Sequence, residues 1–185
     1  MTIKEIIKIT ATIIGREDVV SYLDGNTETL SEDTKKTVEI MERLSNLVIN
    51  ELACSFIPMK NLERVNSQGK VYYKNLSKNP LEILTVYDLD GNKLAFSVAS
   101  TFVKTPTQVV DVEYSFFPPE YSLDDQVGYS EKEVPSRVLA YGLASEYAIT
   151  QGCFKDAVMW HKRYVDSVAE ICSPKNSFVK ERKWL

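Results

Sequence analysis

The first 56 residues have the spacing of apolar positions that is typical of amphipathic helices. One face of a short helix, which Gly15 can end, gathers the isoleucines Ile3, Ile6, Ile7, Ile9 and Ile13. Ser31 precedes acidic residues and predicts the start of a longer helix, because a serine cap and first-turn carboxylates both suit a helix N-terminus. The core-facing stripe of this helix consists of Val38, Met41, Leu44, Val48 and Leu52. We therefore expect residues 1–56 to supply the N-terminal helices of a bundle.

Between residues 57 and 117 the pattern changes to short runs rich in β-branched and aromatic residues. These runs predict strands at residues 71–73, 83–87, 94–99 and 109–114. Residues 88–92 have the chemistry of a hairpin turn, in which Gly91 is free to take a positive φ. The segment is therefore predicted to be a small antiparallel β module inserted between two halves of the helical bundle.

The chain returns to a helical pattern after an acidic segment. Residues 118–134 hold five carboxylates against Lys132 alone and predict an exposed connector loop. In residues 135–172, two helices separated by a stop at Gln151 and Gly152 are predicted to pack as an antiparallel hairpin. The inner face predicted for the second helix consists of Phe154, Ala157, Val158, His161, Val165, Val168 and Ile171.

The order of helices, strands and helices is typical of the α+β class. We expect a helical bundle from the N- and C-terminal helices, an inserted antiparallel β module, and an extended C-terminal tail at residues 173–185.

Composition and charge narrow the class of protein. The 185 residues are 44% hydrophobic and 26% charged, which is typical of a folded domain with its own core. The net charge of −4 gives no overall attraction to nucleic acid. No apolar run has the length that spans a bilayer, and charges interrupt residues 1–15, which we interpret as a helix of the mature protein. We expect synthesis in the cytoplasm and no membrane partner.

Residue types that usually carry catalysis or metal binding are few and scattered. Cys54, Cys153 and Cys172 are far apart and are predicted to be free, buried thiols. The only histidine, His161, is predicted to take part in packing, and no cysteine or histidine pair has the spacing of a zinc site. We predict no catalytic residue, no cofactor and no metal, hence no enzyme. A small enzyme with an unrecognised site in the β module is the opposing hypothesis.

The C-terminal tail combines basic and large apolar side chains. Trp and Arg are frequent anchors of protein interfaces, and an extended segment can lie in a partner's groove. The residues predicted to contact a partner are Phe178, Lys180, Arg182, Lys183, Trp184 and Leu185. Two alternatives are a frayed, solvated terminus and a nucleic-acid-binding module that uses the same basic tail.

The C-terminal third resembles the head–tail connector (adaptor) proteins of tailed bacteriophages. The resemblance rests on a Pro-led helix, a second helix and the basic end KERKWL, with the matching positions Tyr141, Gly142, Ala144, Glu146 and Tyr147, then Ala157, Trp160, Arg163 and Tyr164. It implies a structural virion protein at the neck, in a homo-oligomeric ring commonly of twelve copies. Such a ring joins the portal protein to the next neck or tail protein and extends the DNA channel. DNA would pass through it without specific binding, and residues 178–185 would dock on the portal.

Overall fold

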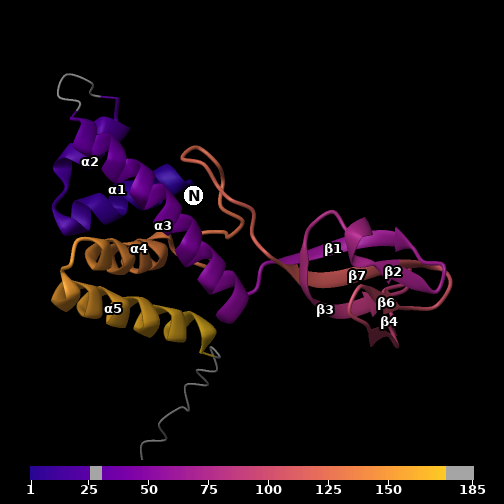
Figure 1. Ribbon diagram of the computed structural model, residues 1–185. Helices are drawn as coiled ribbons and strands as arrows, with labels where there is room; N and C mark the ends of the chain where they lie inside the picture. Colours follow the sequence, from indigo (N-terminus) through magenta and orange to yellow (C-terminus); the bar gives the residue numbers. More distant parts are fainter. Residues whose placement is uncertain (26–30, 174–185) are drawn as a thin grey trace, which may run out of the picture.

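The computed structural model describes residues 1–25 and 31–173 and contains helices and antiparallel sheets, which confirms the α+β class (Figure 1). The helices are α1 (Ile3–Ile14), α2 (Glu17–Leu23), α3 (Glu32–Ser55), α4 (Ser136–Thr150) and α5 (Phe154–Cys172). The strands are β1 (Lys60–Asn66), β2 (Lys70–Tyr72), β3 (Pro80–Tyr87), β4 (Lys93–Leu94), β5 (Ser97–Val98), β6 (Phe102–Lys104) and β7 (Val109–Phe116), with a short 3₁₀ turn, η1 (Tyr73–Asn75), after β2.

The predicted helix stop at Gly15 and helix start at Ser31 are confirmed, and the structure adds a start at Thr2. Thr2 begins α1 with a capping box, in which its hydroxyl accepts a hydrogen bond from the Glu5 amide and the Glu5 carboxylate accepts one from the Thr2 amide. Gly15 ends α1 with a φ of 77°, a conformation that favours glycine. The Ser31 hydroxyl caps α3 by accepting a hydrogen bond from the Thr34 amide.

Helix α4 is the centre of the helical part. It packs against α1, α3 and α5, and nearly all of its residues from Val138 to Ala148 are buried. The apolar residues on all sides of α4 explain this position, because such a helix is stable when other elements surround it. Its small residues, such as Gly142 and Ala144, let the neighbouring helices approach closely. The antiparallel packing of α4 and α5 agrees with the hairpin predicted from their short link.

Strands β1–β7 form two antiparallel sheets, together called the β module. One sheet has the order β1-β7-β3-β4 and the other β2-β6-β5. The predicted hairpin is confirmed: β3 pairs with β4, the Asp88 carboxylate accepts hydrogen bonds from the amides of Asp90 and Asn92, and Gly91 has a φ of 82°. The single return strand predicted at residues 94–99 is wrong. The chain leaves the first sheet after β4 and enters the second at β5.

The prediction of an exposed connector at residues 118–134 is confirmed only in part, although most of its residues are exposed. The segment is a loop, but its carboxylates alternate with buried side chains, which are Tyr121, Val127, Tyr129 and Val134. Asn46 of α3 holds the backbone of Tyr121 through two hydrogen bonds of 2.7 and 2.8 Å, and the Tyr129 hydroxyl donates to the Ile57 carbonyl at 2.6 Å. The connector therefore belongs to the core that joins α3 to the β module.

Figure 1 shows the β module standing beside the helices, where two stretches of chain reach it, one after α3 and one after β7. Helices pack mainly on helices, and strands pair mainly with strands. Much of the surface of each part is therefore left free of the other.

Candidate assembly interface

Helix α5 is rotated relative to the sequence prediction. Its buried residues are Ala157, Tyr164 and Val168, whereas Phe154 is 68% exposed and Val158 is 71% exposed. The apolar face assigned from the sequence mixed two stripes of the helix, and α4 covers only one of them. His161, predicted to be packed, is exposed in the same way.

The uncovered stripe forms what we call the α5 ridge: Phe154, Val158 and Val165, which lie four and seven residues apart and therefore on one side of the helix. Lys155 and Lys162 are the charged residues nearest to this stripe on the helix surface. Three exposed large apolar side chains on one side of a helix are unusual on a free surface, because isolated exposed apolar residues are the normal case. The α5 ridge is therefore a candidate contact surface for another protein chain.

The opposite side of α5 borders a hollow, which we call the α5 groove. The hollow has a volume of about 490 Å³ and lies between α1, α4 and α5. Its apolar walls come from Ile13, Ile14, Ala144, Ala148, Met159 and Trp160, and its polar rim from Arg16, Tyr147, Gln151 and Asp156. Val158 of the ridge and Trp160 of the groove are two residues apart, which places them roughly 200° apart around the helix.

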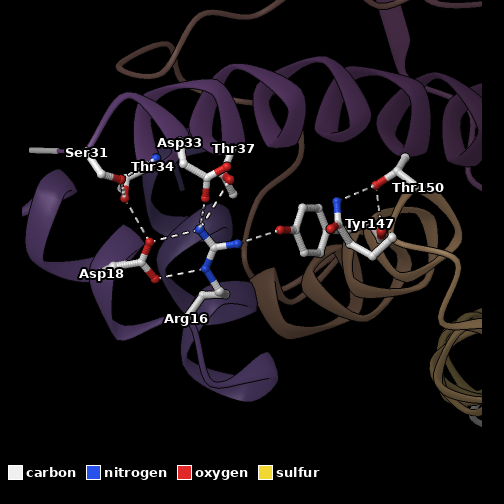
Figure 2. A network of polar contacts seen from close by, with 9 residues as sticks. Arg16, Asp18, Ser31, Asp33, Thr34, Thr37, Tyr147 and Thr150 are labelled. Carbon is white, nitrogen blue, oxygen red and sulfur yellow. Dashed lines mark hydrogen bonds and ion pairs between the residues drawn. The ribbon is translucent and has the colours of Figure 1, made fainter.

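Arg16 fixes the end of this groove through a network of polar contacts (Figure 2). Its guanidinium donates two hydrogen bonds of 2.8 Å to the Asp18 carboxylate and one of 2.8 Å to the Tyr147 hydroxyl on α4. A further bond reaches the Thr37 hydroxyl on α3 at 3.2 Å. The hydrogen bonds from Arg16 hold the pKa of Asp18 well below its usual range. The Arg16 side chain therefore links the start of α2 to α3 and α4, and it holds Tyr147 in place at the rim of the groove.

At Gly142, helix α4 lies very close to α3 and α5. A Cβ atom added there would lie 2.6 Å from Val48 Cγ1 and 3.2 Å from the Tyr164 ring. Glycine thus allows α3 and α5 to meet at α4. The Tyr164 hydroxyl is buried and has no hydrogen-bond partner among the described residues, and its burial raises the pKa of Tyr164.

The cysteines are free, as predicted, but they are not buried. Cys153 and Cys172 are exposed at the two ends of α5, and Cys54 is half-buried. In residues 1–25 and 31–173, no group of three or more His, Cys, Asp or Glu side chains is arranged to hold a metal ion. None of the helices in these ranges is long and apolar enough to cross a bilayer.

The six tail residues predicted to contact a partner lie outside the described residues: Phe178, Lys180, Arg182, Lys183, Trp184 and Leu185. Their predicted role stays a prediction. The structure does place the start of the tail, since α5 ends at Cys172 and Ser173 leaves it in an extended conformation. Sequence reasoning missed the α5 ridge and groove, although the apolar residues on both sides of α5 were a signal for them.

Comparison with protein-family models finds no match, and comparison with curated proteins finds none either.

Proposed function

We propose that this chain is a structural subunit that assembles with other protein chains, and specifically a head–tail connector of a tailed bacteriophage located in the virion neck. The observation that carries the proposal is the exposed α5 ridge, on a helix that leads directly into the basic, tryptophan-containing tail. The resemblance of residues 134–185 to phage adaptors points in the same direction. On this proposal the chain has no catalytic role.

The division of the chain into domains is part of the same proposal. Residues 1–56 and 135–172 would form one helical bundle, and residues 57–117 would be an insert in it. Residues 118–134 would be the connector between them, and residues 173–185 the docking tail. The packing of α4 against both α1 and α3 supports a bundle built from both ends of the chain.

A ring subunit needs two different contact surfaces, one for each neighbour, because a head-to-tail contact closes into a ring when the rotation between copies allows it. Helix α5 offers such a pair on opposite sides: a protruding apolar ridge and an apolar groove. Lys155 and Lys162 border the ridge, whereas the groove is lined by Asp156 and by Arg16, whose charge is paired with Asp18, so the ridge is the more positive of the two surfaces. We propose that the ridge of one copy enters the groove of the next, in a ring that is commonly of twelve copies in the adaptor family.

The portal protein and the next neck or tail protein are the proposed partners above and below the ring. Tail residues Phe178–Leu185 would dock on the portal, with Trp184 as the apolar anchor and Lys180, Arg182 and Lys183 around it. DNA would pass through the ring without sequence-specific contacts.

The proposal is tested by mixing the purified chain with the portal protein of the same phage and measuring the mass of the complex. We expect a ring on the portal from the full chain. Deleting Lys180–Leu185 should abolish docking and leave thermal unfolding unchanged. A second variant, Val158→Asp, should leave the tail able to bind but prevent ring closure.

Three results would count against the proposal. Normal docking by the truncated chain would remove the role of the tail, and normal ring closure by Val158→Asp would remove the role of the α5 ridge. Failure of the full chain to associate with the portal under any condition would remove the adaptor function itself.

A further inference from the structure

The sheet β2-β6-β5 carries positive charge that nothing in the described chain neutralises. Its strands and the segments around them, residues 66–79 and 92–108, contain five lysines and not one aspartate or glutamate. This is unusual in a chain with 26 acidic residues. The charge is therefore concentrated at one place in the β module.

Three of these lysines gather on the outer side of the sheet. Val71 and Val103 are buried on its inner side, so that Lys70, Tyr72, Phe102 and Lys104 alternate to the outside. Lys74 in η1 lies next to them, with its Nζ atom 5.9 Å from the centre of the Tyr72 ring. We call this surface the lysine face: Lys70, Tyr72, Lys74, Phe102 and Lys104.

The register of the sheet places two of the positive charges directly opposite each other. Lys70 pairs with Lys104, and Tyr72 pairs with Phe102 on the neighbouring rung. Like charges at opposed positions of an antiparallel pair destabilise the sheet. The Phe102 ring compensates this only in part, with the Lys70 Nζ atom 4.8 Å from the ring centre.

In the other sheet of the same module, the basic residues of β1 are paired with carboxylates of β7. Arg64 on β1 is held by the Asp111 carboxylate on β7 through two bonds of 2.8 Å, and Lys60 lies 4.0 Å from Glu113. In residues 1–25 and 31–173, no such carboxylate lies within ion-pair distance of Lys70, Lys74 or Lys104. The lysine face therefore gathers three positive charges that have no such partner, whereas β1 and β7 of the neighbouring sheet pair Arg64 and Lys60 with carboxylates.

We propose that the lysine face binds the phosphodiester backbone of nucleic acid without reading its sequence. Lysine ammonium groups are suitable contacts for successive phosphates, and the half-exposed Tyr72 ring beside them offers a stacking surface for an unpaired base. The β module stands to one side of the helices, so a polyanion can reach it (Figure 1). This site uses no residue of the tail or of the α5 ridge, and it does not depend on the adaptor function.

The phosphate backbone could belong to a duplex or to a single strand, and the Tyr72 ring separates the two sources. Fluorescence anisotropy of labelled oligonucleotides of about 20 nucleotides, one single-stranded and one duplex, measures both. We expect Tyr72→Ala to weaken single-strand binding by about tenfold and to leave duplex binding unchanged if unpaired bases stack on the ring. If Tyr72→Ala changes single-strand and duplex affinity equally, the site contacts only the phosphodiester backbone and no base stacks on the ring.

Salt dependence counts the phosphate contacts. Three lysine contacts predict that duplex affinity falls about 40-fold between about 50 and 200 mM salt, and single-strand affinity about 20-fold. The double variant Lys70→Glu/Lys104→Glu should lower affinity by at least about tenfold. It keeps one like-charge pair across the strands, so its stability should match that of the wild type.

The matched control is Lys35→Glu/Lys36→Glu on α3, which changes the net charge equally at exposed positions of the helical part. It should bind like the wild type. If Lys70→Glu/Lys104→Glu unfolds, the variant Lys70→Gln/Lys104→Gln gives the same test with a smaller change in charge.

The proposal is overturned if the wild type binds neither oligonucleotide at about 50 mM salt, or if the control loses as much affinity as the lysine-face variant. It is also overturned if polyglutamate competes away the nucleic acid at equal charge concentration, because the face would then recognise an acidic protein surface.

Discussion

The close approach of three helices at Gly142 gives a prediction whose size follows from the geometry. In Gly142→Ala the new methyl group would lie 2.6 Å from Val48 Cγ1, a separation that packed carbon atoms do not tolerate. Val48 cannot turn away easily, because a valine in a helix has one strongly preferred rotamer. The Tyr164 ring at 3.2 Å closes the other side.

Two effects of opposite sign decide the outcome. Alanine is better than glycine in a helix interior by about 1 kcal/mol. Overpacking a tight core costs about 1–3 kcal/mol. Since the contact involves both a stiff β-branched side chain and a buried ring, we expect an overpacking cost of about 2–3 kcal/mol. After the gain of about 1 kcal/mol in helix propensity, Gly142→Ala should lower the free energy of unfolding by about 1–2 kcal/mol.

Urea denaturation followed by circular dichroism measures this change, and thermal unfolding should show a fall of about 2–4 °C for each kcal/mol. The double variant Val48→Ala/Gly142→Ala provides the internal control, because it makes room for the new methyl group. The two substitutions should be coupled favourably by at least about 1 kcal/mol. A Gly142→Ala protein as stable as the wild type, or additive effects in the double variant, would refute the close packing of α3, α4 and α5.

Three further predictions concern α5, the Arg16 network and the cysteines. Val158→Ser on the exposed ridge should change the unfolding free energy by no more than about 0.5 kcal/mol, whereas Val168→Ala on the buried side should lower it by about 2 kcal/mol; similar losses from both variants in urea denaturation would mean that the inner face indicated by the sequence pattern is buried as a whole. Asp18→Asn should lower stability near neutral pH by about 0.5–1 kcal/mol, a value typical of a partly exposed pair. Because the pKa of Asp18 is depressed in the folded state, its contribution is present above the unfolded pKa and is lost as pH falls through the folded pKa. Unfolding curves of the variant should therefore lose part of the acid dependence that the wild type shows below about pH 4, and identical acid dependence would contradict the ion pair. In the native protein a thiol reagent should modify Cys153 and Cys172 rapidly and Cys54 slowly, as followed by peptide mass spectrometry; fast modification of Cys54 alone would contradict the exposure of α5.

The parts of the fold that sequence reasoning predicted are those with local causes. The Ser31 cap, the Gly15 stop and the turn at Asp88–Asn92 depend on hydrogen bonds and φ values within a few residues. Four of the five residues predicted for the α3 stripe are also buried, namely Val38, Met41, Val48 and Leu52, although Ile40 and Leu47 of the same helix are exposed.

The parts that were missed depend on contacts between distant segments. Strand β1 has few apolar residues and alternates only weakly, and it is recognisable as a strand because it pairs with β7. Helix α5 is apolar on two sides, so only the position of α4 decides which side is buried. The connector looked solvated because its acidic residues outnumber the buried tyrosines between them. In each case the local sequence is compatible with more than one arrangement. Contact with a segment from elsewhere in the chain decides which arrangement forms.

The same reasoning applies to the candidate interface. The tail was found from its composition, whereas the α5 ridge became visible only once α4 was seen to leave Phe154, Val158 and Val165 uncovered. The lysine face likewise needed the register of β2 and β6, because Lys70 and Lys104 are far apart in sequence.

Electron cryomicroscopy of the chain mixed with the portal protein of the same phage tests the central proposal most directly. The account predicts a closed ring of copies beneath the portal, with the α5 ridge of each copy in the α5 groove of the next and residues 178–185 against the portal surface. Particles in which the portal carries no ring, or a ring in which the α5 ridge faces solvent and the tail contacts nothing, would contradict it.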